Sequence, residues 1–179
     1  MLTIENTMAL IIDFQDRLMP AIHNYQELIV KTAILIEGLK LLGVPIVTTQ
    51  QYTKGLGATV PELSGAVGGS GYVEKITFSC CKNEEFRGKL AKAGRKDIAV
   101  AGVEAHICVQ QTVLDLLDHG YNVYIIADCV GSRREMDRLY AERRMERAGA
   151  VLTTSEAALF EMMVAADHPA RKDISNLVK

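Results

Sequence analysis

The sequence predicts a three-layer α/β/α protein built on a doubly wound, parallel, Rossmann-like sheet of about six strands. Short, continuous apolar segments alternate with longer segments of helical apolar spacing along the chain. Strands separated by helices imply right-handed crossovers and a parallel sheet covered on both faces. The length of 179 residues is usual for one domain, so we expect a single domain over residues 1–179.

The first expected elements are a buried strand, a long helix and a second strand. Residues 7–14, TMALIIDF, are continuously apolar and rich in isoleucine, which is typical of a strand buried on both faces. Residues 24–45 repeat apolar side chains at roughly helical spacing until Gly43 and Pro45 stop the helix. The second strand is expected over VPIVTT, residues 44–49.

Residues 50–72 interrupt this alternation. They contain six glycines, which indicates a loop rather than a part of the core. A short third strand is expected within residues 72–78. The next helix is expected over residues 82–94, with Asn83 as its N-cap and Gly94 as its end.

The second half of the chain predicts three strand–helix pairs. The expected strands are residues 97–103, 121–130 and 149–154, and the helices that follow them are residues 106–120, 132–149 and 155–167. The helix over 132–149 mixes arginines with acidic residues, which favours a solvated helix face over a polyanion site.

Composition excludes several classes of function. The net charge of −2 gives no reason to expect a nucleic-acid partner or an anionic membrane surface. The four cysteines are too few and too irregular for a disulfide framework, and neither a signal-peptide pattern nor a membrane-length apolar run occurs. We therefore expect a cytoplasmic protein with reduced thiols. Phosphate-binding glycine motifs also fail, because GLGATV lacks the third glycine of the dinucleotide fingerprint, and no cofactor is expected.

Candidate chemical groups follow three of the expected strands, where ligands bind in doubly wound sheets. Asp13 ends the first strand, Cys108 follows the strand over 97–103, and Lys75 near the third strand could reach the same crevice. The start of a helix favours the thiolate and lowers the pKa of a cysteine. Each residue also has a structural reading: Cys108 as a packed apolar residue, Asp13 as a loop cap and Lys75 as a surface lysine. Together they predict a Cys–Asp–Lys site.

ALIIDFQ, VEKITFSC and AVAGVEAHICVQQTVLDLL together resemble the isochorismatase-like cysteine hydrolase superfamily, over nearly the whole chain. The resemblance implies a catalytic triad of Asp13, Lys75 and Cys108. It also implies a non-proline cis peptide bond between Val103 and Glu104, and an oxyanion hole formed by the backbone N–H groups of Glu104 and Cys108.

The same resemblance suggests the surroundings of the triad. Gln15 matches the family's frequent D-x-Q pattern, so we expect it to orient the triad or the substrate. The other residues expected around the substrate are Phe14, Gln50, Tyr52 and His106. His106 is not favoured as the base, because it lies two residues from Cys108, on a different side of the turn.

Nicotinamidases in this family bind a metal through an Asp-x-His pair and a further histidine after the second strand. The corresponding residues 48–63 contain no histidine and no aspartate, and the other histidines have no ligand spacing. We therefore expect no metal, and a hydrolase that cleaves a small amide or related C–N bond. The chain looks like the small isochorismatase-domain-containing hydrolases of unassigned substrate, and the resemblance favours a homo-oligomer that binds a small molecule.

Three alternatives stay open. One is an isochorismatase-type hydrolase acting on a vinyl ether, although no feature indicates a site for its dianionic substrate. Another is a binding or scaffold protein that retains the fold without turnover, because fold does not imply function. The third is a redox-sensing role for Cys108.

Overall fold

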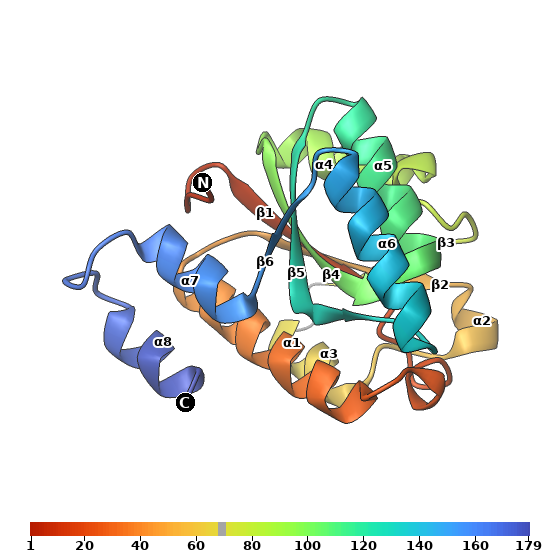
Figure 1. Cartoon of the computed structure of the whole chain (residues 1–179), viewed down its shortest axis with the longest axis horizontal. Helices are drawn as coiled ribbons and strands as arrows, with labels where there is room; N and C mark the ends of the chain where they lie inside the picture. Colours follow the sequence, from red (N-terminus) through yellow and green to blue (C-terminus); the bar gives the residue numbers. More distant parts are fainter. Residues whose placement is uncertain (68–70) are drawn as a thin grey trace.

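Six strands form one parallel sheet in the computed structural model, which describes residues 1–67 and 71–179 (Figure 1). The strand order is β3-β2-β1-β4-β5-β6, so the direction of winding reverses between β1 and β4. The strands are β1 (Thr7–Ile12), β2 (Ile46–Gln51), β3 (Val73–Lys75), β4 (Asp97–Val103), β5 (Asn122–Gly131) and β6 (Val151–Thr153). The predicted doubly wound parallel sheet is confirmed.

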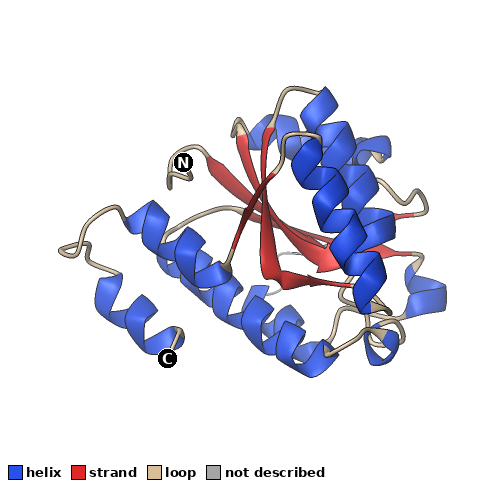
Figure 2. Ribbon diagram, in the orientation of Figure 1, coloured by secondary structure: helices blue, strands red, loops and turns tan. Residues whose placement is uncertain are grey.

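Helices cover both faces of the sheet (Figure 2). One face carries α1 (Tyr25–Leu41), α3 (Pro61–Val67), α7 (Ser155–Met163) and α8 (Arg171–Leu177). The other face carries α4 (Glu84–Ala93), α5 (Gln110–Asp118) and α6 (Glu135–Arg147). Shorter helical turns are η1 (Met19–Ala21), α2 (Thr53–Leu56), η2 (Cys80–Lys82) and η3 (Ala105–Val109).

Strand β1 shows why the apolar runs are continuous. All six of its residues are buried. Ala9 and Ile11 belong to the core beneath α1, whereas Met8, Leu10 and Ile12 belong to the core beneath α4, α5 and α6. Successive side chains of a strand point to opposite faces, so a strand covered on both sides needs apolar residues at every position.

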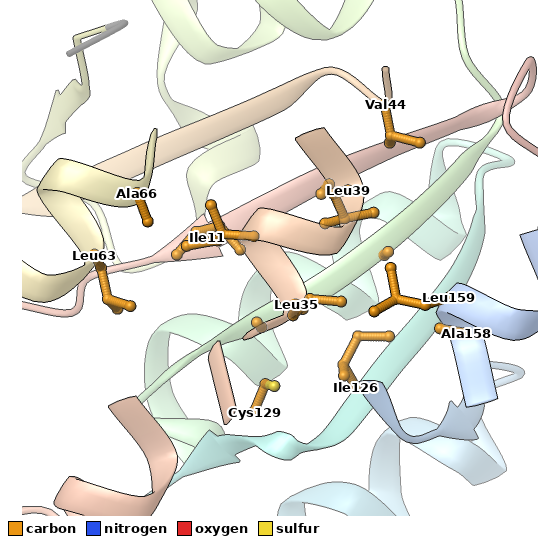
Figure 3. Close-up of a cluster of buried hydrophobic side chains, with 14 of the residues drawn as sticks. Ile11, Leu35, Leu39, Val44, Leu63, Ala66, Ile126, Cys129, Ala158 and Leu159 are labelled. Carbon is orange, nitrogen blue, oxygen red and sulfur yellow. The ribbon is translucent and has the colours of Figure 1, made fainter. Parts of the chain in front are cut away.

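The core on the α1 face joins elements that are far apart in the sequence (Figure 3). Ile11 of β1, Leu35 of α1 and Leu63 of α3 belong to it. Helices α1 and α7 also approach closely in this core, because a Cβ atom added to Gly38 would lie 2.5 Å from Cδ1 of Leu159. The absent side chain at Gly38 therefore allows this packing.

The prediction that residues 50–72 form a loop is wrong in part. Strand β2 extends to Gln51, and both α2 and α3 form within this segment. Proline suits the first turn of a helix, so α3 begins at Pro61, and Leu63 and Ala66 are then buried against α1. Residues 68–70 of the expected loop, which include Ser70, lie outside the described residues.

Helix α8 was not expected. It contains one fully buried residue, Ile174, which is too short an apolar signal to show a period. No helix within residues 1–67 and 71–179 has the length and apolar character needed to cross a membrane.

Candidate active site

Asp13 and Lys75 form a fully buried ion pair at the carboxyl ends of the strands. Asp13 follows β1 with a φ of 58°, a left-handed conformation that aspartate tolerates better than most residues. Nζ of Lys75 donates to Oδ2 of Asp13 at 2.6 Å and to Oε1 of Gln51 at 2.8 Å. The hydroxyl of Thr49 donates to Oδ1 of Asp13 at 2.7 Å. Both carboxylate oxygens are therefore bound, and neither charged side chain is exposed.

Lys75 stays protonated in this environment. Burial by itself would lower the pKa of Lys75. The negative charge of Asp13, helped by Cys80 and Cys108 and by the hydrogen bond to Asp13, outweighs burial, and the pKa is raised. The ammonium can therefore hold a carboxylate and a developing thiolate nearby.

Cys108 lies in η3, a π-helical turn between β4 and α5. Burial, together with the negative charge of Asp13, raises the pKa of its thiol to about 12, although the positive charge of Lys75 acts to lower it. A hydrogen bond to Asp13 also favours the neutral thiol. The expected lowering of this pKa is therefore wrong: desolvation and a neighbouring anion outweigh the helix start, and the resting group is a thiol.

Glu104 connects the thiol turn to Arg133. The peptide bond between Val103 and Glu104 is cis. The carbonyl oxygen of Glu104 accepts hydrogen bonds from the N–H groups of Ile107 and Val109, at 3.0 and 3.3 Å. Its carboxylate oxygen Oε2 accepts from Nε of Arg133 at 2.9 Å and from the Arg133 backbone N–H at 3.3 Å.

A cavity of about 370 Å³ opens at this point. Its apolar lining residues are Leu18, Ala21, Leu56, Phe78 and Ile107, and its polar ones are Asp13, Gln51, Glu104, Cys108 and Arg133. The structure therefore brings the carboxylate of Asp13 and the thiol of Cys108 to one cavity. Lys75 binds Asp13 but is not among the residues that line the cavity.

The remaining substrate residues expected from the sequence lie elsewhere. Phe14 is 1% exposed and packs in the core on the α1 face, because the strand ends two residues earlier than expected. Gln50 lines a separate cavity of about 220 Å³ and bonds to Thr59. Tyr52 is 49% exposed, and Nδ1 of His106 lies 3.0 Å from Oγ of Ser132. None of these four side chains is among the described residues that line the Cys108 cavity.

Gln15 is fully buried and holds the segments beside the cavity together. Its Nε2 donates to the carbonyl oxygens of Gln51, at 3.0 Å, and Gly57, at 2.7 Å. Its Oε1 accepts from the N–H of Gln51 at 2.7 Å. Gln15 therefore fixes the end of β2, and through it Gln51, which binds Lys75.

The sequence reasoning missed Gln51, Phe78, Arg133 and the carboxylate of Glu104. A signal for Gln51 was present: residues alternate faces along a strand, so Gln51 shares the face of Thr49, which binds Asp13. Gln51 is also the register partner of Lys75. No comparable signal pointed to Arg133, because its position depends on how β5 and α6 pack beside η3.

Metal-ligating side chains do not cluster in the described part of the chain: no group of three or more histidine, cysteine, aspartate or glutamate residues is placed to hold an ion there. The four cysteines are free thiols and buried.

The fold and site define a doubly wound α/β protein with a thiol, a carboxylate and an ammonium at the switch point of its sheet. Residues 7–157 match the isochorismatase domain. The chain therefore belongs to the isochorismatase family, and the family resemblance predicted from the sequence is confirmed.

Two curated relatives are similar along most of this chain. Isochorismatase domain-containing protein 1 of Danio rerio is 38% identical over 167 residues, which are 93% of this chain. The chain spans only 59% of the length of that relative. Isochorismatase domain-containing protein 2 of Danio rerio is 35% identical over 178 residues, which are 99% of this chain and 89% of the relative.

Solved structures agree with this assignment. The MAR1 ribonuclease from Caenorhabditis elegans superposes with a TM-score of 0.93 at 36% identity, covering 99% of this chain and 91% of that one. The YcaC gene product of Escherichia coli, an octameric hydrolase of unknown specificity, superposes with a TM-score of 0.89 at 26% identity, covering 98% of this chain and 86% of that one.

Proposed function

We propose that this protein is a metal-independent cysteine hydrolase that cleaves a small amide or a related C–N bond through a thioester on Cys108. One observation carries the proposal: the Cys108 thiol and the Asp13 carboxylate line the same cavity, and Lys75 binds Asp13 at 2.6 Å. A nucleophile beside a base that a third group orients is the usual arrangement for covalent catalysis.

The raised pKa of Cys108 means that the thiol needs a base, and we propose that Asp13, which lines the same cavity, is that base. Asp13 takes the thiol proton while the sulfur attacks the carbonyl carbon of the substrate. The ammonium of Lys75 limits the charge that builds up on this pair, and the backbone N–H groups of Glu104 and Cys108 stabilise the oxyanion. When the tetrahedral intermediate collapses, the C–N bond breaks and the amine leaves with the proton held by Asp13.

Water completes the cycle. Asp13 removes a proton from water as the water oxygen attacks the thioester carbonyl. The C–S bond breaks, the acid leaves, and Asp13 returns its proton to the Cys108 sulfur. The thiol and the carboxylate are restored, so the reaction consumes only the substrate and water.

Two rival activities fit the site less well. A vinyl-ether substrate with two carboxylates would need several cations, whereas Arg133 is the only cationic side chain that lines the cavity among the described residues. The ribonuclease name of the Caenorhabditis elegans relative suggests RNA, but phosphate backbones are bound by clusters of lysine and arginine, and the net charge of this chain is −2. A small neutral or singly charged amide suits the cavity better.

The wider context is also proposed. We propose that residues 1–179 act as one domain, in the cytoplasm, without a cofactor, nucleic acid or membrane. The octameric state of the Escherichia coli relative supports a homo-oligomer.

A substrate screen with paired variants tests the function. The protein is assayed against small amides, ureides and nicotinamide, with Cys108→Ala and Cys129→Ala in parallel. Cys129 is a buried thiol in the core on the α1 face, so it controls for the loss of a cysteine. Cys108→Ala should abolish turnover, whereas Cys129→Ala should retain it. Turnover by Cys108→Ala would refute the mechanism.

A further inference from the structure

Arg133 lines the cavity, and the Nε side of its guanidinium is anchored to Glu104. Its Nε and its backbone N–H both bind a single oxygen of Glu104, at 2.9 and 3.3 Å. Among the residues that the structure describes, none accepts a hydrogen bond from Nη1 or Nη2. The side chain is 57% exposed and lines the cavity.

Because Glu104 holds Nε of Arg133, the guanidinium is fixed in place and its two terminal nitrogens are preorganised hydrogen-bond donors. The Glu104 carbonyl accepts from Ile107 and Val109 in the turn that holds Cys108, so Glu104 ties Arg133 to the nucleophile. A guanidinium offers parallel N–H bonds that match the two oxygens of a carboxylate. Since Glu104 uses one oxygen on the Nε side, the terminal nitrogens stay available for such a pair.

The other polar side chains around the cavity are engaged within the protein. Both oxygens of Asp13 are bound, by Thr49 and Lys75. Gln51 accepts from Lys75 and donates to the carbonyl of Ile76 at 2.7 Å. Among the described residues that line the cavity, Arg133 is therefore the cationic side chain whose terminal nitrogens have no acceptor within the protein.

The rest of the lining is apolar. Leu18, Leu56, Phe78 and Ile107 form most of the wall, and such a wall binds hydrocarbon rather than polar groups. The volume of about 370 Å³ is near the small end of ligand cavities, which start at roughly 300 Å³. A ligand that fits this cavity has three parts: a scissile carbonyl for the Cys108 thiol, a short hydrocarbon body for the apolar wall, and a terminal anion for Arg133.

We propose that Arg133 is a specificity residue that binds a carboxylate of the substrate, so that the substrate class is a short aliphatic or aromatic amide bearing a carboxylate. This inference rests on the proposed amide-hydrolase function for the reacting end of the ligand. Arg133 binds the end of the ligand that is distant from the scissile bond. Removing Arg133 therefore weakens the binding of ligands that carry a carboxylate and not that of uncharged ligands.

Matched ligands in an inactive background test binding apart from turnover. Cys108→Ala protein is titrated calorimetrically with succinamate, glutaramate and adipamate, and with their uncharged counterparts butanamide, pentanamide and hexanamide. At least one anionic amide should bind about tenfold more tightly than its counterpart. Adding Arg133→Met should remove that preference, Arg133→Lys should retain part of it, and Arg134→Met, at an exposed neighbour outside the cavity lining, should retain all of it.

The outcomes separate the two proposals. Equal binding of the charged and uncharged amides, or a preference that survives Arg133→Met, overturns the role of Arg133. A preference that depends on Arg133, in a wild-type protein that hydrolyses none of the amides, overturns the hydrolase function and leaves the carboxylate site standing. Hydrolysis of both ligand types at equal kcat/KM supports the hydrolase and refutes this specificity.

Discussion

Lys75 and Asp13 meet across an intervening strand. Asp13 follows β1 and Lys75 ends β3, with β2 between them in the sheet, yet Nζ and Oδ2 lie 2.6 Å apart with neither side chain exposed. Strand β2 binds both partners, Thr49 holding Asp13 and Gln51 holding Lys75. The pair is thus held by three neighbouring strands of the sheet, and its geometry depends on their register.

The first prediction concerns this buried pair. Lys75→Met should lower the free energy of unfolding by about 3–5 kcal/mol, because it leaves a buried carboxylate without its cation. Adding Asp13→Asn should recover much of this loss, because asparagine is uncharged and tolerates the left-handed backbone at residue 13. Urea unfolding of the single and double variants measures both effects. A double variant no more stable than Lys75→Met would contradict this account.

The second prediction concerns the pH dependence of Cys108. Below a thiol pKa of about 12, each unit of pH raises the thiolate fraction about tenfold. The rate of iodoacetamide labelling of Cys108 should therefore keep rising from neutral into alkaline pH. Mass spectrometry of the labelled peptides measures it, and Cys129, which is 0% exposed, should react more slowly. A plateau near neutral pH would show a lowered pKa instead.

The third prediction concerns Gln15. Gln15→Leu should lower the free energy of unfolding by about 3 kcal/mol, because it removes three hydrogen bonds of a buried side chain and leaves the half-buried backbone groups of Gln51 and Gly57 without these partners. Hydrolysis should fall as well, because Gln51 then loses the support that holds it against Lys75. Gln26→Leu, at an exposed position of α1, is the matched control. Equal stability of the two variants would refute the bridging role.

The fourth prediction compares two glycines in helices. Gly38→Ala should destabilise the protein by about 1–3 kcal/mol, because its Cβ would overlap Leu159 of α7. Gly88→Ala in α4 should instead stabilise it by about 0.5–1 kcal/mol, because a Cβ there meets no atom within 4 Å. Thermal unfolding of both variants measures whether each substitution lowers or raises the stability of the protein. Stabilisation by Gly38→Ala would show that α1 and α7 can move apart freely.

The fifth prediction concerns metal removal. Dialysis against a chelator should leave the hydrolysis rate unchanged, because the described residues hold no cluster of metal-ligating side chains. The assay is repeated after zinc is added back. A rate that falls with the chelator and recovers with zinc would show that the reaction needs a metal.

Parts of the site followed from the sequence because they depend on chain order. Polar residues just after apolar strands come to one edge of a parallel sheet, so Asp13, Lys75 and Cys108 could be predicted to gather there. Phe14 and Gln50 could not be placed in this way, since a strand that ends one or two residues from its expected end turns the next side chains to another face.

The sequence by itself determined the layers of this protein. Continuous apolar runs such as TMALIIDF bury both faces of a strand, and their alternation with helices specifies a doubly wound parallel sheet. Only the tertiary structure decided the state of the site. The pKa of Cys108 rises because burial and Asp13 act on it together, and Arg133 reaches the cavity because Glu104 anchors it. Desolvation and contacts between distant segments arise only when the chain is packed, so they cannot be predicted from a local sequence pattern.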